Sequence, residues 1–164
     1  AKCGGNYAAS MIAQTEGEKH GCKQVIFKDP HRGDAIEELG GMNVFFVFGK
    51  ENKIVTPELT GTILEGVTRS SLIQLAKDRG MTVEERAITL TEWREGVANG
   101  DITEIFACGT AAVVAPIGKL KAEDFEIPAP TEHFGEISKS LREELVGIQT
   151  GVVEDRHGWL TRLI

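Results

Sequence analysis

The sequence predicts a mixed α+β fold within the α/β class, an open pseudo-barrel of mixed strands surrounded by helices. Three observations support this prediction. Strand-like and helix-like segments interleave irregularly along the 164 residues, whereas a doubly wound parallel sheet requires regular alternation. The length suits one compact domain, and no internal repeat or low-complexity tract divides it. No G-x-G-x-x-G or Walker motif supports a dinucleotide or nucleoside-triphosphate site.

The N-terminal half is expected to contain one helix followed by short strands. Residues 7–20 have helical composition, and Gly21 provides a stop signal. Four strands are predicted in this half, at residues 24–29, 35–38, 43–48 and 53–56. A turn is expected over 30–34, and the residues 39–42, L-G-G-M, are expected to form a flexible joint.

The C-terminal half is expected to alternate between helices and strands. Helices are predicted at residues 68–79, 91–99 and 137–148, and strands at residues 82–88, 104–107 and 112–117. Gly80 and Gly100 follow the first two helices as stop signals. The tail over 151–164 carries Trp159, Leu160 and Leu163, and we expect these apolar side chains to dock it on the body.

Composition and charge exclude several classes of protein. Hydrophobic residues make up 41% of the chain and charged residues 26%, as in soluble globular domains. The net charge of -7 argues against nucleic acid or an anionic membrane as the main partner. No apolar run is long enough to span a bilayer, and no signal peptide is visible. We therefore expect a cytoplasmic protein.

Cysteines and histidines give no evidence of disulfides or metal. Cys3, Cys22 and Cys108 are odd in number and far apart, which indicates free thiols in a reducing compartment. The histidines have no metal-ligand spacing, so no metal site is expected. Among them, His20 and His31 are expected at the surface, and His157 in a structural role.

Two segments with charged side chains, one with a lysine and one with two glutamates, have both an ordinary and a functional interpretation. Lys2 precedes two glycines and is either solvated, as most lysines are, or a Schiff-base nucleophile with a lowered amine pKa. Glu37 and Glu38 end a predicted strand. Both can be solvated, or the one that faces inward can hold a protonated pyridinium nitrogen. The residues alone do not decide which acid faces inward.

Two further segments are suited to anions. Residues 64–69, L-E-G-V-T-R, begin a predicted helix, whose free backbone amides favour an anion. Thr68 is also the expected N-cap of this helix, and the two roles are compatible. Residues 107–112, A-C-G-T-A-A, follow a strand and serve either tight packing or the binding of phosphate and carboxylate oxygens.

Taken together, these segments resemble the branched-chain aminotransferases, pyridoxal-phosphate enzymes of fold type IV. The resemblance covers the chain from Lys2 to the tail. It rests on five strings in order: K-C-G-G-N-Y-A-A-S, E-E-L-G-G-M-N-V-F-F-V, T-P-E-L-T-G-T-I-L-E-G-V-T-R, E-I-F-A-C-G-T-A-A-V-V-A-P and D-R-H-G-W-L. It implies that residues 1–164 form a C-terminal large cofactor-binding domain. The small domain that precedes it in the family is absent here, so we expect little activity from this chain alone.

The resemblance implies roles for individual residues around pyridoxal 5'-phosphate. Lys2 matches the catalytic lysine that forms the Schiff base. Tyr7 matches the tyrosine that bonds the 3-hydroxyl oxygen, and Glu38 matches the carboxylate on the pyridine nitrogen. Leu64 matches an apolar residue that packs against the ring.

The phosphate and the substrate are implied to lie at the remaining positions. Val67 and Thr68 match the turn that binds phosphate through backbone amides. Thr110 and Ala111 match the loop near the phosphate and the substrate carboxylate. Further cofactor contacts are implied for Gly41, Asn43 and Gly66.

The implied reaction is transamination between leucine, isoleucine or valine and 2-oxoglutarate, giving branched-chain 2-oxo acids and glutamate, in a homodimer. One alternative keeps the fold but changes the reaction, to that of a D-amino-acid transaminase or an aminodeoxychorismate lyase. Another is a non-catalytic anion-binding module. The strings G-G-M-N-V-F-F-V and F-A-C-G-T-A-A favour the branched-chain group.

Overall fold

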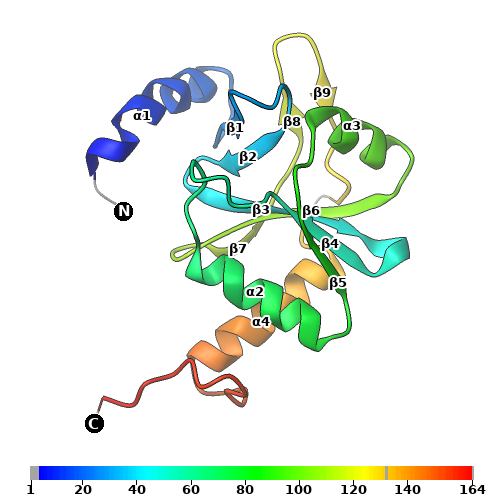
Figure 1. Ribbon diagram of the computed structural model, residues 1–164. Coiled ribbons are helices and arrows are strands. Elements are labelled where there is room, and N and C mark those ends of the chain that lie inside the picture. The colour runs from blue at the N-terminus through cyan, green and yellow to red at the C-terminus, as the bar shows by residue number, and fades with distance from the viewer. Residues whose placement is uncertain (1–3, 132, 164) are drawn as a thin grey trace.

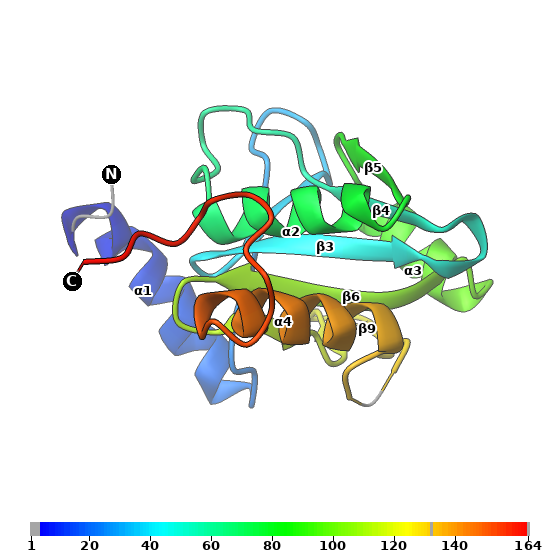
Figure 2. The same cartoon turned by 90° about the horizontal axis from the view of Figure 1, so that it is seen from below.

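The computed structural model describes residues 4–131 and 133–163 and shows a twisted sheet with helices on both faces (Figure 1). Helices α2 (Val67–Asp78) and α4 (Glu136–Gln149) cover one face, as Figure 2 shows from below. Helix α3 (Leu90–Ala98) covers the other face, together with the hairpin of β8 (Leu120–Lys121) and β9 (Glu126–Ile127). The predicted mixed α+β class is therefore confirmed.

The main sheet is organised around one central strand. Its strands are β1 (Ile26–Lys28), β2 (Ile36–Leu39), β3 (Met42–Phe48), β4 (Lys53–Thr56), β5 (Thr82–Glu85), β6 (Ile102–Gly109) and β7 (Val113–Pro116). β6 runs along one edge of β3. β2 and β4 share the other edge, β2 at its start and β4 at its end. All pairs are antiparallel except β4 with β5, so the sheet is mixed, as predicted.

Alternating side chains of β3 and β6 supply two separate cores, because successive residues of a strand point to opposite faces. Phe45 stacks on Phe106 at a centroid distance of 5.0 Å beneath α2 and α4. On the other face, Phe46 meets the fully buried Trp93 of α3 edge-on at 5.2 Å. The apolar run in β3 is thus buried on both sides, which fixes the register of the strand that reaches the site.

Most predicted elements are present, with boundaries shifted by a few residues. The main correction concerns residues 39–42, which do not form a flexible joint. Leu39 pairs with Met42 across a two-residue turn, and Gly40 has a φ of +60°. A glycine in the left-handed region at the first turn position is typical of a tight hairpin. The strands β8 and β9 and the 3-10 turn η1 (Gly49–Glu51) were not predicted, because two- or three-residue elements carry no measurable periodicity.

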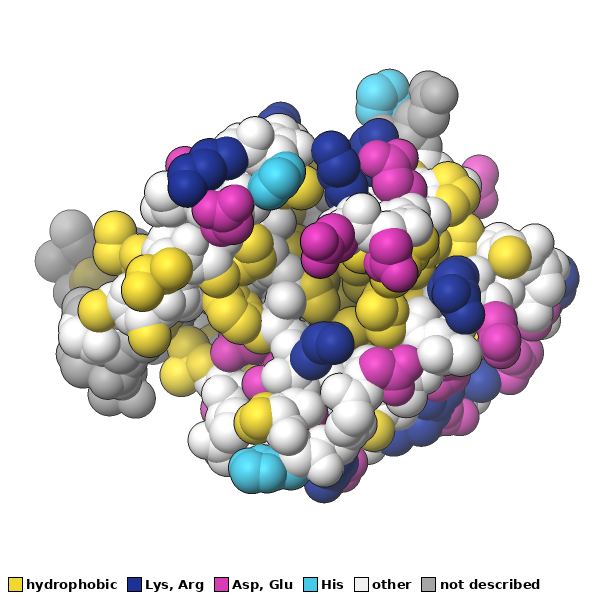
Figure 3. Space-filling view, turned by 90° about the horizontal axis from the view of Figure 1, so that it is seen from above, with side chains coloured by type: hydrophobic (Ala, Val, Ile, Leu, Met, Phe, Trp, Pro, Cys, Tyr) yellow, Lys and Arg dark blue, Asp and Glu magenta, His cyan; other side chains and the backbone are white. Residues whose placement is uncertain are grey.

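Helix α1 (Gly4–Lys19) extends away from the sheet at the side of the molecule (Figure 1). Its Met11 and Ile12 side chains are 65% and 78% exposed. Hydrophobic side chains accordingly gather at this end of the surface in Figure 3. Gly17 anchors the C-terminal part of the helix, since a Cβ there would lie 2.9 Å from Val25 Cγ1. The outer part of α1 therefore has an uncovered apolar face.

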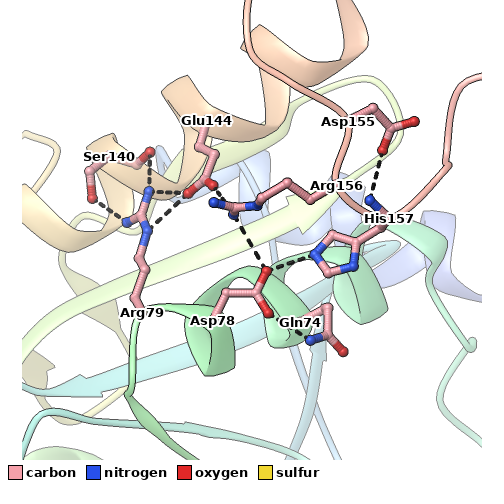
Figure 4. A network of polar contacts seen from close by, with 8 residues as sticks. All are labelled: Gln74, Asp78, Arg79, Ser140, Glu144, Asp155, Arg156 and His157. Carbon is pink, nitrogen blue, oxygen red and sulfur yellow. Dashed lines mark hydrogen bonds and ion pairs between the residues drawn. The ribbon is translucent and has the colours of Figure 1, made fainter.

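The tail after α4 is held by polar groups, so the expectation of apolar docking is wrong. Trp159, Leu160 and Leu163 are 37%, 48% and 89% exposed. Instead, His157 Nε2 lies 2.7 Å from Asp78 Oδ2, and Arg156 Nη2 donates to Glu144 Oε1 at 2.6 Å (Figure 4).

Around this network, Arg79 connects the end of α2 to α4 by donating to Ser140 and Glu144. The ring of Trp159 stacks on His157 at 4.7 Å. His157 thus has the structural role that was expected of it, and His20 and His31 are exposed, as predicted.

Candidate functional site

A cavity of about 240 Å³ opens where β3 and β6 meet the start of α2. Its lining residues are Gly41, Asn43, Leu64, Glu65, Gly66, Val67, Thr68, Cys108, Gly109 and Thr110. The volume lies just below the range of roughly 300–1,000 Å³ typical of small-molecule sites. Within the described part of the chain, no lysine or arginine lines this cavity. The described lining residues therefore offer an anion backbone amides and hydroxyl groups.

The cavity brings together most of the cofactor residues predicted from sequence. Those that line it are Gly41, Asn43, Leu64, Gly66, Val67, Thr68 and Thr110. Ala111 follows Thr110 in an exposed turn and is not part of the lining. Lys2 lies outside the described residues. Segments separated by more than twenty residues thus converge on one cavity.

Tyr7 reaches the cavity from α1. A Cβ placed on Gly41, which lines the cavity, would lie 3.6 Å from Tyr7 Cε1. The ring therefore lies against the backbone of the β2–β3 turn. A side chain at position 41 would contact this ring, and glycine leaves the backbone open to it. The start of α1 is thereby placed at the rim of the cavity.

Asn43 is the buried polar residue on the floor of the cavity. It is 6% exposed, and its Nδ2 donates to the carbonyl oxygen of Leu64 at 3.1 Å. Its cross-strand partners are Glu38 on the adjacent strand β2 and Cys108 on the adjacent strand β6. Cross-strand partners share a face of the sheet, so Glu38 lies on the same face as Asn43 and the cavity.

A β-bulge separates the two neighbouring acids. Phe27 pairs with Glu38 and Lys28 pairs with Ile36, which leaves Glu37 as the extra residue. A bulge redirects side chains, so simple strand alternation does not apply here. Glu37 is 8% exposed and accepts a hydrogen bond from the Thr62 hydroxyl, away from the cavity lining.

Helix α2 begins at the cavity without a side-chain cap. Gly66 is the N-cap, so the expectation that Thr68 is the N-cap is wrong. Among the described residues, no side chain caps the first amides. The first amides of a helix have no partner within it, and the helix dipole makes this end favourable for negative charge. Because Gly66, Val67 and Thr68 all line the cavity, this end of α2 faces into it.

Gly66 is required at the turn by a close contact. A Cβ there would lie 2.3 Å from Asn43 Oδ1 and 3.3 Å from Arg69 Cβ. The φ of −85° is ordinary for any residue, so the constraint is steric. Arg69 is 4% exposed, and its Nη2 donates to Pro57 O at 2.8 Å and to Glu85 Oε2 at 2.9 Å. Arg69 therefore joins Pro57, at the start of the loop 57–66, to helix α2, which follows the end of this loop.

The β6–β7 hairpin forms the remaining wall. Gly109 pairs with Val113 across the turn 110–112. Val113 has a φ of +57°, which is unfavourable for a β-branched residue. Strain of this kind is common where a loop has a functional conformation to keep.

Cys108 is a neutral thiol in the wall of the cavity. Burial raises its pKa to about 12, and the charge of Arg69 opposes this shift only in part. Since the thiolate is the reactive form, Cys108 is not a nucleophile at neutral pH. The Cys108 side chain packs in the hydrophobic core beneath this wall.

Sequence reasoning missed three lining residues: Glu65, Cys108 and Gly109. Each belongs to a segment that was singled out as suited to anions, yet none was assigned to the site. For Cys108 the pairing with Asn43 was the missing information, and a pairing register is not visible in one sequence.

The described ranges show neither a metal cluster nor a membrane-spanning helix. Residues 4–131 and 133–163 contain no group of three or more His, Cys, Asp or Glu side chains placed to hold a metal ion. In the same ranges, no helix combines the length and the apolar character needed to cross a bilayer.

Comparison with known proteins gives one family. The family model for "Amino-transferase class IV" matches residues 3–120. The branched-chain-amino-acid aminotransferase of Mycolicibacterium smegmatis is 50% identical over 165 residues, which cover 99% of this chain and 45% of that protein. A probable branched-chain-amino-acid aminotransferase of Streptomyces coelicolor is 49% identical over 99% of this chain and 44% of its own length. The chain thus spans less than half the length of these relatives.

Solved structures agree with the sequence comparison. The branched-chain amino acid aminotransferase of Escherichia coli matches with a TM-score of 0.81 and 32% identity, over 100% of this chain and 49% of that chain. A second branched-chain amino acid aminotransferase, from T.th. and solved with pyridoxamine 5'-phosphate, matches with a TM-score of 0.82 and 32% identity, over 100% and 49% of the two chains.

Proposed function

The chain belongs to the class IV aminotransferase family, and from this premise we propose that it binds pyridoxal 5'-phosphate and takes part in transamination between branched-chain L-amino acids and 2-oxoglutarate. The observation that carries the proposal is the cavity at the uncapped start of α2, where Asn43, Leu64 and Thr110 converge from separate segments. Similarity to the branched-chain aminotransferases of M. smegmatis and E. coli supports the substrate class.

The residues of the cavity fit this cofactor. The free amides of Val67 and Thr68 suit a phosphate dianion and need no side-chain charge. The hydroxyl of Thr110 can donate to the same group. Glu38 lies on the cavity face of the sheet, where a carboxylate can accept a hydrogen bond from a protonated ring nitrogen. Leu64 offers an apolar surface for the ring.

When bound, pyridoxal 5'-phosphate supplies an electron sink for negative charge that develops at the α carbon of an amino acid. The chain's own residues supply position and protons. We assign the covalent attachment of the cofactor to Lys2, whose amine also moves the proton at the substrate α carbon. Tyr7 orients the ring from the rim beside Gly41. Thr110 and Ala111 are assigned to the substrate carboxylate at the β6–β7 turn.

Borohydride reduction of the full chain with pyridoxal 5'-phosphate tests the cofactor and its attachment. We expect a yellow protein whose label becomes permanent, and peptide mass spectrometry should locate the label on Lys2. Lys2→Ala should lose both colour and label, whereas Lys28→Ala, an exposed lysine on β1, should keep them. Equal labelling of several surface lysines, or none at all, would contradict the proposal.

Substrate profiling separates the branched-chain reaction from its alternatives. Because little activity is expected from this chain alone, the profiling uses the chain joined to the small domain of the family. L-Leucine, L-isoleucine and L-valine should then each yield glutamate from 2-oxoglutarate, and D-alanine should not. A preference for D-amino acids would support the D-amino-acid transaminase alternative instead.

We also propose a cytoplasmic homodimer. The uncovered apolar face of α1, with Met11 and Ile12, favours a protein contact at that end of the molecule. Cys22 and Cys108 are free thiols, which suits a reducing compartment. A monomer mass in analytical ultracentrifugation at micromolar concentration would contradict the dimer.

A further inference from the structure

The loop 57–66 leads from β4 to the start of α2 and is fastened to the body at several points. Its first part packs against the segment that connects β1 to β2, where the space left between them is only about 10 Å³, roughly one water molecule. Arg32 forms an ion pair with Glu58 across this contact. Its last part turns into the cavity, where Asn43 holds the carbonyl oxygen of Leu64. The loop is therefore held near both its start and its end.

Glu37 is the buried polar group that meets this loop from the sheet. It is 8% exposed, and the hydroxyl of Thr62 donates to its Oε1. The Thr62 hydroxyl lies 2.8 Å from that of Thr60, which continues the polar chain outward. Thr62 precedes Leu64 by two residues and Gly66 by four. The carboxylate thus holds the loop immediately before it becomes the cavity wall.

The bulge in β2 explains how Glu37 comes to serve the loop. Glu37 lies on β2 opposite the step from Phe27 to Lys28 on β1, so it has no cross-strand partner in the β1–β2 register. Its side chain therefore need not follow the alternation of the strand. Glu38, one residue later, stays opposite Asn43 on the cavity face. The two adjacent carboxylates therefore have different surroundings. Glu38 lies on the face of the sheet that carries the cavity, and Glu37 bonds the loop at Thr62.

We infer that Glu37 is a positioning residue, whose buried carboxylate, through Thr62, fixes the loop 57–66 so that the amides at the start of α2 keep their place in the cavity. The inference rests on the proposed binding of a phosphate-bearing cofactor at those amides. Free amides bind an anion more tightly when they are held in place before the anion arrives, because no ordering cost is then incurred on binding. Glu37 holds the loop at Thr62, Asn43 holds it at Leu64, and Arg69 at the start of α2 holds Pro57 at the beginning of the loop.

The test measures affinity for two ligands that differ by one phosphate, pyridoxal 5'-phosphate and pyridoxal, in the full chain. Glu37→Ala and Thr62→Val each remove the hydrogen bond. We expect each to weaken binding of pyridoxal 5'-phosphate about tenfold, which corresponds to about 1.4 kcal/mol, and to leave pyridoxal binding unchanged. Thr62→Ser keeps the hydroxyl and should bind as the unaltered chain does.

Thr131→Val is the matched control, because it removes a threonine hydroxyl bond, to the His133 carbonyl oxygen, in a different loop. It should leave both affinities unchanged. The inference is overturned if Thr62→Val binds pyridoxal 5'-phosphate normally, or if both ligands are weakened equally, as general destabilisation would cause. Should Glu37→Ala fail to fold, Thr62→Val and Thr62→Ser still decide. Failure of the unaltered chain to bind the cofactor would instead refute the proposed function itself.

Discussion

The side-chain amide of Asn43 donates to the carbonyl oxygen of Leu64 at 3.1 Å, and its Oδ1 lies against Gly66. One buried side chain of the central strand thereby fixes the turn from which α2 begins. Since no side chain of the turn caps the helix, the geometry of the turn depends on its contacts with Asn43 on β3. Three experiments follow from this arrangement of strand, turn and hairpin, and a fourth concerns the tail.

Asn43→Ala should weaken both the fold and the site. The substitution leaves the carbonyl oxygen of Leu64 without its donor in this part-buried bond, at a cost of about 0.5–1.5 kcal/mol in the free energy of unfolding. Affinity for pyridoxal 5'-phosphate should fall as well, because the amides of Val67 and Thr68 lose their support. Urea denaturation and a cofactor titration measure the two effects.

Asn99→Ala is the control for this change. It also removes one side-chain hydrogen bond, from the Asp101 amide at 3.0 Å, but at an exposed helix end remote from the cavity. It should cost little stability and leave cofactor affinity unchanged. An Asn43→Ala chain that binds the cofactor as tightly as the control would show that the turn is held by other contacts.

Gly66→Ala should lower cofactor affinity through sterics alone. The new Cβ would lie 2.3 Å from Asn43 Oδ1, so the turn or the amide must move. Overpacking of this kind costs about 1–3 kcal/mol. Gly118→Ala is the comparison, because a Cβ at that position meets nothing within 4 Å. Equal melting temperatures and equal affinities for the two variants would rule out the close contact.

Sequence periodicity predicted the elements that form the scaffold of this site because their apolar patterns are long. The apolar residues of β3 are buried on both faces of the sheet, and Leu72, Leu75 and Ala76 form the buried apolar stripe of α2. Such patterns reflect burial directly. The separate segments suited to anions could likewise be recognised from their residue types, and the structure brings residues from both of them to one cavity.

What could not be predicted depends on pairing and on contacts far apart in sequence. The bulge at Glu37 requires knowledge of the β1–β2 register, which alternation within one strand does not contain. The N-cap at Gly66 escaped because threonine is the stronger local signal, whereas the contact with Asn43 selects glycine. The tail was misjudged because its apolar residues are conspicuous in the sequence, yet its anchors are Asp78 and Glu144 on distant helices.

Val113 and Val114 are adjacent in β7 and should respond very differently to glycine. Val114 is 2% exposed, so Val114→Gly removes about 2 kcal/mol of burial and adds about 0.5–1 kcal/mol of backbone entropy. Val113 is only partly buried and has a φ of +57°, where a β-branched residue costs of order 1–3 kcal/mol. Relief of this strain offsets the loss.

Urea denaturation should therefore show Val113→Gly to be more stable than Val114→Gly by at least about 2 kcal/mol. Val113→Gly should still alter the site, because the strained residue sets the geometry of the turn that carries Thr110. Equal losses of stability in the two variants would show that Val113 is unstrained in solution.

Acid should release the tail before it unfolds the sheet. Hydrogen bonds from Gln74 and His157, with the charges of His157 and Arg156, lower the pKa of Asp78, and amides of the turn, that of Leu160 foremost, lower the pKa of Asp155. A carboxyl group whose pKa is lowered in the folded state stabilises that state at pH values above the ordinary pKa. It loses this contribution as the pH falls through the lowered value.

Hydrogen exchange followed by mass spectrometry, corrected for intrinsic rates, should show residues 152–163 losing protection between about pH 4 and pH 2 while β6 keeps its protection. Asp155→Asn should expose the same segment already at pH 6. Tail protection that persists at pH 2, or that disappears together with that of β6, would mean that the two carboxylates do not hold the tail.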